Sequence, residues 1–262
     1  MKIIVLVKQV PGTDSVKLDP VTGVMVRTGK DTIMNPLDEN ALAEAVRIKS
    51  SYSDVRITAV SMGPASAMKA IKEAIAMGAD DGVLVSGREF AGSDTIATAK
   101  VIAAAIRKCG DADVILCGER ATDGETGQTA AMIAHYLGIP AQTYVSALEV
   151  LEDGVIVKRT VEGGFERVKV TFPVLVSVNK DIRDTGFPTL DGKLKAKQVD
   201  VPVLGNAELA FDKSELGLNG SPTRVVKIFS PKLSRDTIMV KANATMQPIE
   251  ELISFLAQKD VL

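Results

Sequence analysis

The chain has 262 residues, of which 46% are hydrophobic and 24% are charged, and its formal net charge is −2. A charge this close to zero gives no electrostatic reason to expect nucleic acid or an anionic membrane as a partner. Two cysteines, Cys109 and Cys117, are too few for a disulfide framework or a metal-ligand cluster. No apolar run approaches the length of a membrane span. Near the start, a run of only five apolar residues precedes Lys8, which is too short for the apolar region of a signal peptide, so we expect a cytoplasmic protein.

Up to Pro140 the chain alternates between short apolar runs and segments with helical spacing of apolar residues. The apolar runs predict strands at 3–7, 55–61, 82–85 and 113–117. The helical spacing predicts helices at 35–50, 65–77, 95–109 and 128–137. Turn residues at 19–23 predict a surface hairpin that ends near Arg27. The repeated alternation of strand and helix predicts an α/β fold built on a doubly wound, mostly parallel sheet.

After Pro140 the pattern changes to short extended runs separated by Gly- and Pro-containing turns. These runs predict an antiparallel hairpin extension of the sheet, with strands at 145–151, 155–160, 166–170 and 174–178. The polar segment 180–197 contains glycine and proline and predicts a long loop. Beyond it lies an irregular tail that ends in one amphipathic helix at 249–258. We therefore expect an α/β domain at 1–200 and, at 201–262, an extended C-terminal arm that lies on a partner subunit.

Polar, glycine-rich loops follow the predicted parallel strands. Ligands of open parallel sheets bind outside the carboxyl ends of the strands, where the strand order reverses. The loops at that edge are 8–14, 62–66, 86–94 and 118–128, with 35–38 added by the first crossover. Their common position predicts a ligand crevice. Loop 118–128 leads into a helix N-terminus, which suits an anionic or nucleotide-like ligand.

Two of these loops also fit a purely structural role. Thr122 and Glu125 have the spacing of a capping box, and Thr126 or Thr129 could cap the helix that follows. Neither a Walker A loop nor a G-x-G-x-x-G turn is present, so no standard phosphate motif supports a nucleotide site here. In the same way, Ser93 or Asp94 could simply cap the helix at 95–109.

The side chains that usually perform catalysis do not form a recognisable set in this sequence. His135 is the single histidine, and there is no Ser/His/Asp or Cys/His pairing, no H-E-x-x-H and no cysteine cluster. Lone acids such as Asp123 and Glu125 are not by themselves an acid/base pair. We therefore predict no catalytic and no metal-binding residues, and we expect a bound cofactor to carry the reaction.

Six short motifs together resemble the beta subunit of electron transfer flavoproteins, the ETF beta/FixA family. They lie in order along the chain, at 7–11, 34–38, 76–80, 121–128, 189–197 and 220–224. The resemblance covers residues 1 to about 232. It implies an adenine nucleotide alpha hydrolase-like domain, a heterodimer with an alpha subunit onto which the C-terminal arm reaches, and electron shuttling with a flavin-dependent dehydrogenase. An ATP pyrophosphatase is a rival of the same fold, but residues 8–14 lack its Ser-Gly-Gly-x-Asp-Ser loop. An ATP-binding module would not need the tail.

The resemblance leaves two cofactors open. One branch of the family holds a structural AMP in the beta subunit, whereas the electron-bifurcating branch holds a second FAD that exchanges a hydride with NAD(H) and implies ferredoxin as a further partner. Residues 92–98 and 123–126 are similar to the bifurcating branch, which favours FAD. Residues 127–131 depart from that branch and are nearer in part to the AMP-binding type, so AMP remains the alternative.

The resemblance also implies which residues line the nucleotide and which meet a partner. The expected cofactor-binding residues are Leu6, Val7, Lys8, Asn35, Pro36, Asp38, Ser61, Met62, Gly92, Asp94, Thr95, Thr98, Cys117, Gly118, Asp123, Gly124, Glu125, Thr126, Gly127, Gln128 and Thr129. Leu190 matches the family's recognition-loop leucine and is expected to insert into a partner dehydrogenase. Lys195 and Lys197 would form a charged rim around that anchor.

Overall fold

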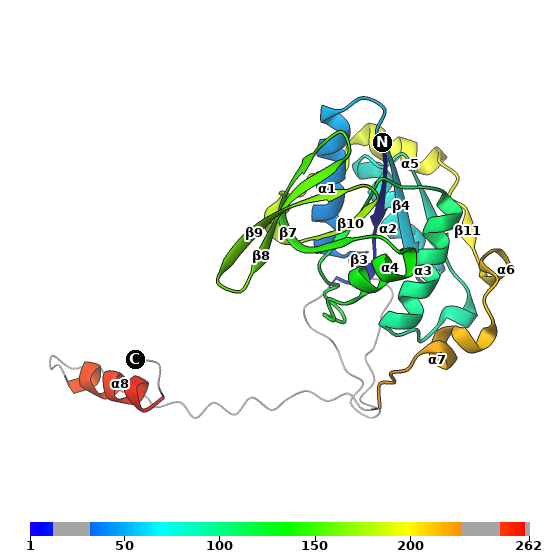
Figure 1. The fold of residues 1–262 in the computed structure, drawn as a ribbon. Helices are drawn as coiled ribbons and strands as arrows, with labels where there is room; N and C mark the ends of the chain where they lie inside the picture. The colour runs from blue at the N-terminus through cyan, green and yellow to red at the C-terminus, as the bar shows by residue number, and fades with distance from the viewer. Residues whose placement is uncertain (13–31, 227–246, 260–262) are drawn as a thin grey trace. The chain divides into compact units, whose positions relative to one another are not determined.

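The computed structural model describes residues 1–12, 32–226 and 247–259. The hairpin predicted around 19–27 lies outside these residues. In the described part, a nine-stranded sheet has the order β11-β5-β4-β1-β6-β10-β7-β8-β9 (Figure 1). Its strands are β1 (Lys2–Leu6), β4 (Arg56–Met62), β5 (Asp81–Val85), β6 (Val114–Gly118), β7 (Ala141–Val150), β8 (Gly154–Val161), β9 (Gly164–Thr171), β10 (Val174–Val178) and β11 (Val203–Leu204). Strands β2 (Gln9–Pro11) and β3 (Thr32–Met34) form a separate antiparallel pair.

The central sheet is covered by helices on both faces, which confirms the doubly wound α/β fold. Every pairing from β11 to β7 is parallel. Side chains alternate along β1: Ile3 and Val5 enter one core cluster, whereas Ile4 and Leu6 enter the other. The first cluster packs against α1 (Pro36–Ser51) and α2 (Met68–Met77), and the second packs against α3 (Thr95–Cys109) and α4 (Thr129–Leu137). A 3-10 turn, Ala65–Ala67, precedes α2.

The antiparallel extension is smaller than predicted, because β10 is not part of it. β10 lies between β6 and β7 and pairs with both in parallel, and all five of its residues are buried. Its sequence, Val-Leu-Val-Ser-Val, is a continuous apolar run, which is typical of a parallel strand covered on both faces. Only β7, β8 and β9 form the antiparallel meander, whose β8–β9 hairpin projects from the body of the unit (Figure 1).

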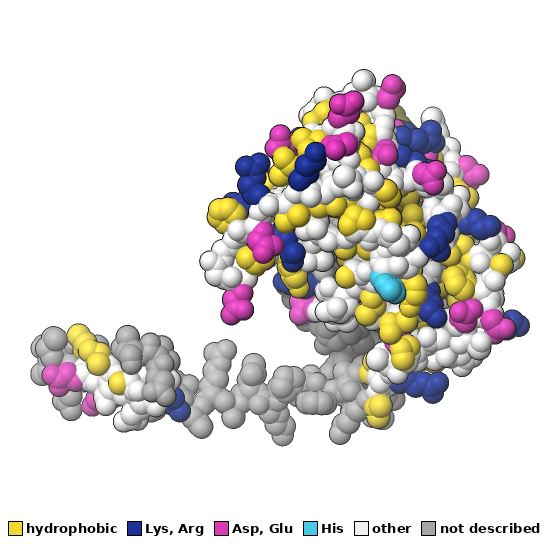
Figure 2. Space-filling model, viewed as in Figure 1, with side chains coloured by type: hydrophobic (Ala, Val, Ile, Leu, Met, Phe, Trp, Pro, Cys, Tyr) yellow, Lys and Arg dark blue, Asp and Glu magenta, His cyan; other side chains and the backbone are white. Residues whose placement is uncertain are grey.

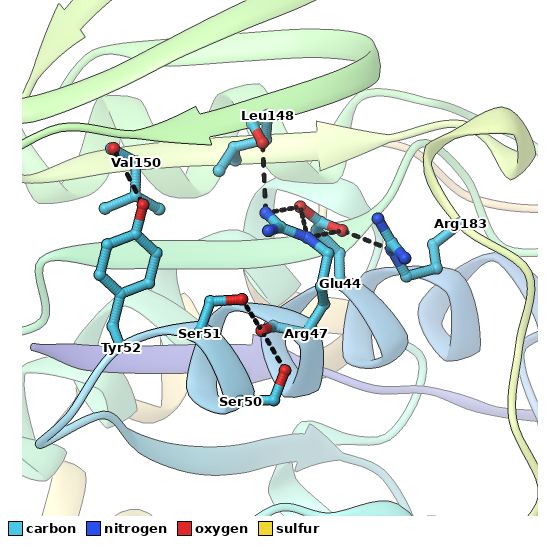
Figure 3. Close-up of polar contacts among 8 residues, drawn as sticks. All are labelled: Glu44, Arg47, Ser50, Ser51, Tyr52, Leu148, Val150 and Arg183. Carbon is cyan, nitrogen blue, oxygen red and sulfur yellow. Dashed lines mark hydrogen bonds and ion pairs between the residues drawn. The ribbon is translucent and has the colours of Figure 1, made fainter.

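An ion-pair network fastens this meander and the segment after β10 to α1 (Figure 3). The carboxylate of Glu44, which is 1% exposed, accepts from Arg47 Nη2 at 2.6 Å and from Arg183 Nε at 2.9 Å. Arg47 also donates to the carbonyl oxygen of Leu148 on β7. The buried Glu44 therefore connects α1 to Arg183 directly and to β7 through Arg47.

The second half of segment 180–197 is a helix, so the loop predicted there is wrong. After a 3-10 turn at Lys180–Ile182, α5 spans Leu190–Gln198, and Thr189 Oγ1 caps it by accepting from the N–H of Gly192 at 3.0 Å. The sequence does not indicate this helix, because Ala196 is its only buried residue and its apolar residues show almost no helical periodicity.

Residues 201–226 belong to the first compact unit, which extends from Met1 to Val226. β11 adds a parallel strand beside β5, and the short helices α6 (Asn206–Leu209) and α7 (Gly217–Gly220) follow it. Residues 201–226 are also the first part of the predicted C-terminal arm, 201–262. Further 3-10 turns of this unit span Arg88–Phe90 and Lys213–Glu215.

The second unit, residues 227–262, contains α8 (Gln247–Gln258), which confirms the predicted terminal helix. Its exposed apolar residues are Ile249, Leu252, Ile253 and Phe255. None of the helices in the described residues combines the length and apolar character that a membrane crossing requires. On the face drawn in Figure 2, acidic and basic side chains are intermixed and do not gather into one patch.

Candidate functional site

The strand order reverses between β1 and β6. From β1 the chain moves to β4 and β5 on one side, then returns to place β6 on the other side of β1. The carboxyl ends of these two central strands carry Lys8 and Gly118, and the loops predicted to form the crevice start there. This is the position at which open α/β sheets bind ligands.

Asp38 joins the two strands at this switch point. Its Oδ2 accepts from the backbone N–H of Lys8 after β1, and its Oδ1 accepts from the N–H of Gly118 at the end of β6, both at 2.9 Å. The fit is close, because a Cβ on Gly118 would lie 2.8 Å from Asp38 Oδ1 and 2.6 Å from Leu37 Cβ. Position 118 therefore requires glycine, and Asp38 positions the loops that follow β1 and β6.

The environment of Asp38 changes its acidity. Burial raises the pKa of this carboxyl from 3.8 to about 7, although hydrogen bonds from Gly118, Asn35 and Lys8 oppose the shift. Loss of water around a carboxylate disfavours its charged form more than these hydrogen bonds favour it. A group that titrates near neutrality therefore lies between the two central strands.

Asn35 ties the loop after β6 to the loop after β1. Its side chain is 1% exposed, and its Nδ2 donates to the carbonyl oxygen of Arg120 at 3.0 Å. Its Oδ1 accepts from the N–H of Thr122 at 3.2 Å, and its own N–H donates to the carbonyl oxygen of Lys8 at 2.8 Å. The 35–38 segment thus supplies the scaffold of the site, while the exposed Pro36 begins α1.

The acidic residues of loop 118–128 are partly neutralised. Asp123 forms an ion pair with Lys8 at 2.7 Å, and its side chain is only 16% exposed. Glu125 is exposed, has a left-handed φ of 48°, and lies 4.0 Å from Arg120. The lysine after β1 therefore offsets the charge of Asp123 at this edge of the sheet.

Loop 118–128 does not cap α4 with a side chain. The N-cap of α4 is Gln128, which makes no side-chain cap bond, so neither the capping box nor a threonine cap is formed. Among the hydrogen bonds between described residues, none uses the backbone N–H of Thr126, Gly127 or Gln128. Unpaired N–H groups at a helix start are donors for an anion.

In the loop after β5, the capping alternative is confirmed for Asp94. Its Oδ1 accepts from the N–H groups of Ile96 and Ala97, both at 3.0 Å, and its Oδ2 accepts from Thr223 Oγ1 at 2.8 Å. Burial would raise the pKa of Asp94, but these bonds hold it below its ordinary value. With both oxygens occupied, Asp94 organises the loop rather than offering a free carboxylate.

Ser221 and Thr223 complete this loop; they lie in motif 220–224 but are not among the expected cofactor-binding residues. The N–H of Asp94 donates to Ser221 Oγ at 2.8 Å, and Ser221 Oγ donates to the carbonyl oxygen of Gly217 at 2.6 Å. Gly92 has a φ of 76°, and a Cβ there would lie 2.6 Å from Leu218. Motifs 92–98 and 220–224 are therefore in contact, which the resemblance alone did not indicate.

The remaining predicted residues lie along the same edge with varied exposure. Leu6, Val7 and Cys117 are buried at strand ends, and burial, followed by the nearby charge of Asp38, raises the pKa of the Cys117 thiol. Ser61 is 1% exposed, and its Oγ has no hydrogen-bond partner among the described residues. The other members are partly or fully exposed: Met62, Thr95, Thr98, Gly124 and Thr129.

The expected partner-docking residues lie apart from this edge, on α5. Leu190 is 75% exposed at the first position of the helix, and Leu194 is 49% exposed one turn later. Lys195 is engaged elsewhere, since its Nζ donates to the carbonyl oxygen of Ala79 at 3.0 Å, whereas Lys197 is exposed. Leu194, which the sequence analysis did not select, extends the apolar surface of Leu190.

Comparison with known proteins gives consistent matches. The family model described as "Electron transfer flavoprotein domain" matches residues 22–209. The chain is 44% identical over 247 residues to the electron transfer flavoprotein subunit beta of Megasphaera elsdenii, with 92% of each chain covered. It is 41% identical over 263 residues to the protein of that name from Thermoanaerobacterium thermosaccharolyticum, and 36% identical over 262 residues to the caffeyl-CoA reductase-Etf complex subunit CarD of Acetobacterium woodii. The last two matches cover all of both chains.

Proposed function

Because the chain belongs to the electron transfer flavoprotein beta-subunit family, we propose that it binds FAD at the carboxyl edge of its sheet. In this proposal it is one subunit of a heterodimer with an alpha subunit. It passes electrons between NAD(H), the flavin of the alpha subunit and a partner dehydrogenase, by flavin-based bifurcation with ferredoxin as a further partner.

The observation that carries the proposal is the arrangement of loop 118–128. Asn35 holds the start of this loop, and the ion pair of Lys8 with Asp123 limits its negative charge. Its end presents N–H groups without partners among the described residues, at the start of an α4 helix that has no side-chain cap. Phosphate oxygens of a dinucleotide fit such donors and the positive end of the helix dipole.

The side chains at this edge suit binding and orientation. FAD, when bound, supplies the chemistry of hydride and single-electron transfer. Asp38 and Asn35 hold the loops on either side of the switch point at a fixed separation. The buried Ser61 Oγ, which lacks a described partner, is available as a donor or acceptor toward that ligand.

The similarity to a subunit of a named reductase complex supports a proposal about the enzyme with which this chain exchanges electrons. The relative from Acetobacterium woodii is named as a subunit of a caffeyl-CoA reductase-Etf complex. We propose that the present chain also works with a flavin-dependent acyl-CoA dehydrogenase or reductase in the cytoplasm. Leu190 and Leu194 on α5 form the apolar anchor of that contact, and Lys197 lies at its rim.

The cofactor content of the purified complex tests the central claim. The full chain, with the subunit that co-purifies, is denatured, and FAD and AMP are quantified per heterodimer. We expect two FAD and no AMP. One FAD with one AMP would contradict bifurcation and establish the alternative that residues 127–131 leave open, a beta subunit with a structural AMP. Absence of any flavin would contradict the proposed function as a whole.

A further inference from the structure

Tyr144 adopts a backbone conformation that is unusual for an aromatic residue. Its φ is 57°, in the left-handed region. It lies where β7 leaves its parallel pairing with β10 and enters the antiparallel meander. The register shifts there on both sides, between Val176 and Val178 on β10 and between Val145 and Ala147 on β7. These register shifts account for the left-handed backbone at this position, because a β-bulge can place one residue in that region.

The register shifts do not explain why this residue is tyrosine. Glycine or asparagine adopts positive φ with far less steric conflict than a bulky side chain. Non-glycine residues that keep a left-handed conformation are concentrated at functional sites, and β-bulges often direct a side chain toward a site. The side chain of Tyr144 therefore requires a separate reason.

The side chain lies beside the end of loop 118–128. A Cβ on Gly127 would lie 3.5 Å from Tyr144 Oη. The strand register places this tyrosine at the carboxyl edge, because Val178 of β10 is level with both Gly118 and the adjacent Val145. Tyr144 is 44% exposed, and its hydroxyl takes part in none of the hydrogen bonds between described residues. A free phenol thus neighbours the N–H groups at the start of α4.

We propose that Tyr144 is an additional nucleotide-contact residue. Its ring bounds loop 118–128 on the side of β7, and its hydroxyl donates a hydrogen bond to a phosphate or ribose oxygen held at the N-terminus of α4. This inference rests on the proposed function, because it needs a nucleotide at that edge. FAD and AMP share the phosphate and ribose chemistry that Tyr144 would recognise.

Two substitutions separate the hydroxyl from the backbone. Tyr144→Phe removes only the hydroxyl, whereas Tyr144→Asn removes the ring and places a residue that tolerates positive φ. Tyr52 supplies the matched controls Tyr52→Phe and Tyr52→Asn, because it is similarly exposed, at 43%, and its hydroxyl donates to the carbonyl oxygen of Val150, which is not part of the candidate site. Each full chain is prepared with its co-purifying subunit, freed of nucleotide, and titrated separately with FAD and with AMP.

The expected result is a loss of affinity without a loss of stability. The nucleotide that wild type retains should bind roughly tenfold more weakly to Tyr144→Phe, as expected for a lost hydrogen bond to a charged group, and more weakly still to Tyr144→Asn. The Tm of nucleotide-free Tyr144→Asn should equal or exceed that of wild type, and the Tyr52 variants should bind normally.

Three other outcomes would overturn the inference, and they are distinguishable. If wild type binds nucleotide and both Tyr144 variants bind it equally well, Tyr144 makes no contact, and the proposed function stands. If only Tyr144→Asn binds weakly and its Tm also falls, the ring supports the fold. If wild type binds neither FAD nor AMP, the proposed function and the inference both fail.

Discussion

At the residue scale, Asp38 has the partners on which the candidate site most depends. Each of its carboxylate oxygens accepts from one backbone N–H, and these N–H groups belong to different strands, at Lys8 and Gly118. A buried N–H without an acceptor costs about 1–3 kcal/mol. In its ionised form the Asp38 side chain supplies two acceptors and no donor, which few other side chains can do at this place.

Asp38→Asn is expected to destabilise the first unit. The amide offers one acceptor oxygen, so its NH2 group would face one of the two N–H donors. We predict a loss of about 1–3 kcal/mol in the free energy of unfolding, together with weaker nucleotide retention. Urea denaturation measures the first effect, and the exposed Asp200→Asn is the matched control. Equal stability of the two variants would show that Asp38 does not join the strands.

The same side chain predicts a pH dependence. Its pKa is raised from 3.8 to about 7 in the folded chain, so the folded state binds this proton more tightly than the unfolded state. The resulting contribution to stability is complete below about pH 4 and is lost as the pH rises through about 7. Asp38→Asn cannot titrate, so the advantage of wild type over this variant should shrink between about pH 4 and 7. A constant advantage in urea unfolding across that range would contradict the assigned shift.

At the scale of elements, α5 depends on one close approach to α2. A Cβ on Gly192 would lie 2.1 Å from the carbonyl oxygen of Ala76 in α2. We expect Gly192→Ala to push α5 away and to lower the free energy of unfolding by about 1–3 kcal/mol, as overpacking does. Thermal unfolding measures the effect. Gly186→Ala is the control, because no atom lies within 4 Å of a Cβ there, and equal melting of both variants would contradict the close packing.

The exposed side of α5 carries a separate prediction. Leu190 and Leu194 are one helical turn apart and therefore lie on the same side of the helix. Leu190→Ala should weaken docking of the partner dehydrogenase by about 1 kcal/mol or more and slow electron transfer to it, while flavin content stays unchanged. Stopped-flow reduction with that dehydrogenase is the measurement, with Tyr52→Ala as a distant control. Loss of flavin from Leu190→Ala would show that the residue has a different role.

At the scale of the whole molecule, the chain has two units with different kinds of apolar surface. The first, Met1–Val226, buries its own core on both faces of the sheet. The second contains α8, whose exposed apolar residues include Ile249, Leu252 and Ile253. An amphipathic helix of this kind is typical of a segment that packs against another surface.

A chain that ends at Val226 is expected to remain folded and to lose its partner. The first unit should still unfold cooperatively, because the residues in the core clusters of the described chain all belong to it. Removal of residues 227–262, the last part of the predicted arm, should prevent co-purification of the alpha subunit, since the apolar side of α8 would be gone. Calorimetry and affinity co-purification measure the two effects. Co-purification at the wild-type level would contradict the role of the arm.

Local sequence patterns were sufficient to predict most helices and strands. The elements that they did not predict correctly depend on contacts between residues far apart in the sequence. The helix at 95–109 was predicted to the residue, because its Ala/Ile spacing and its Asp94 cap are local features. The helix at 190–198 was missed, because its contacts with α2 come from residues far away in sequence. β10 was assigned to the wrong part of the sheet, because its pairing with β6 cannot be read from a five-residue apolar run.

The sequence by itself determined the family, the α/β class and the loops that form the carboxyl edge, because these depend on residue order and on apolar periodicity. Only the tertiary structure decided what the polar side chains in those loops do. Asp38 joins two strands, Asp94 holds Thr223, and Asp123 pairs with Lys8. The partners named here are 30 to 129 residues away from these carboxylates along the chain, so folding alone brings them together.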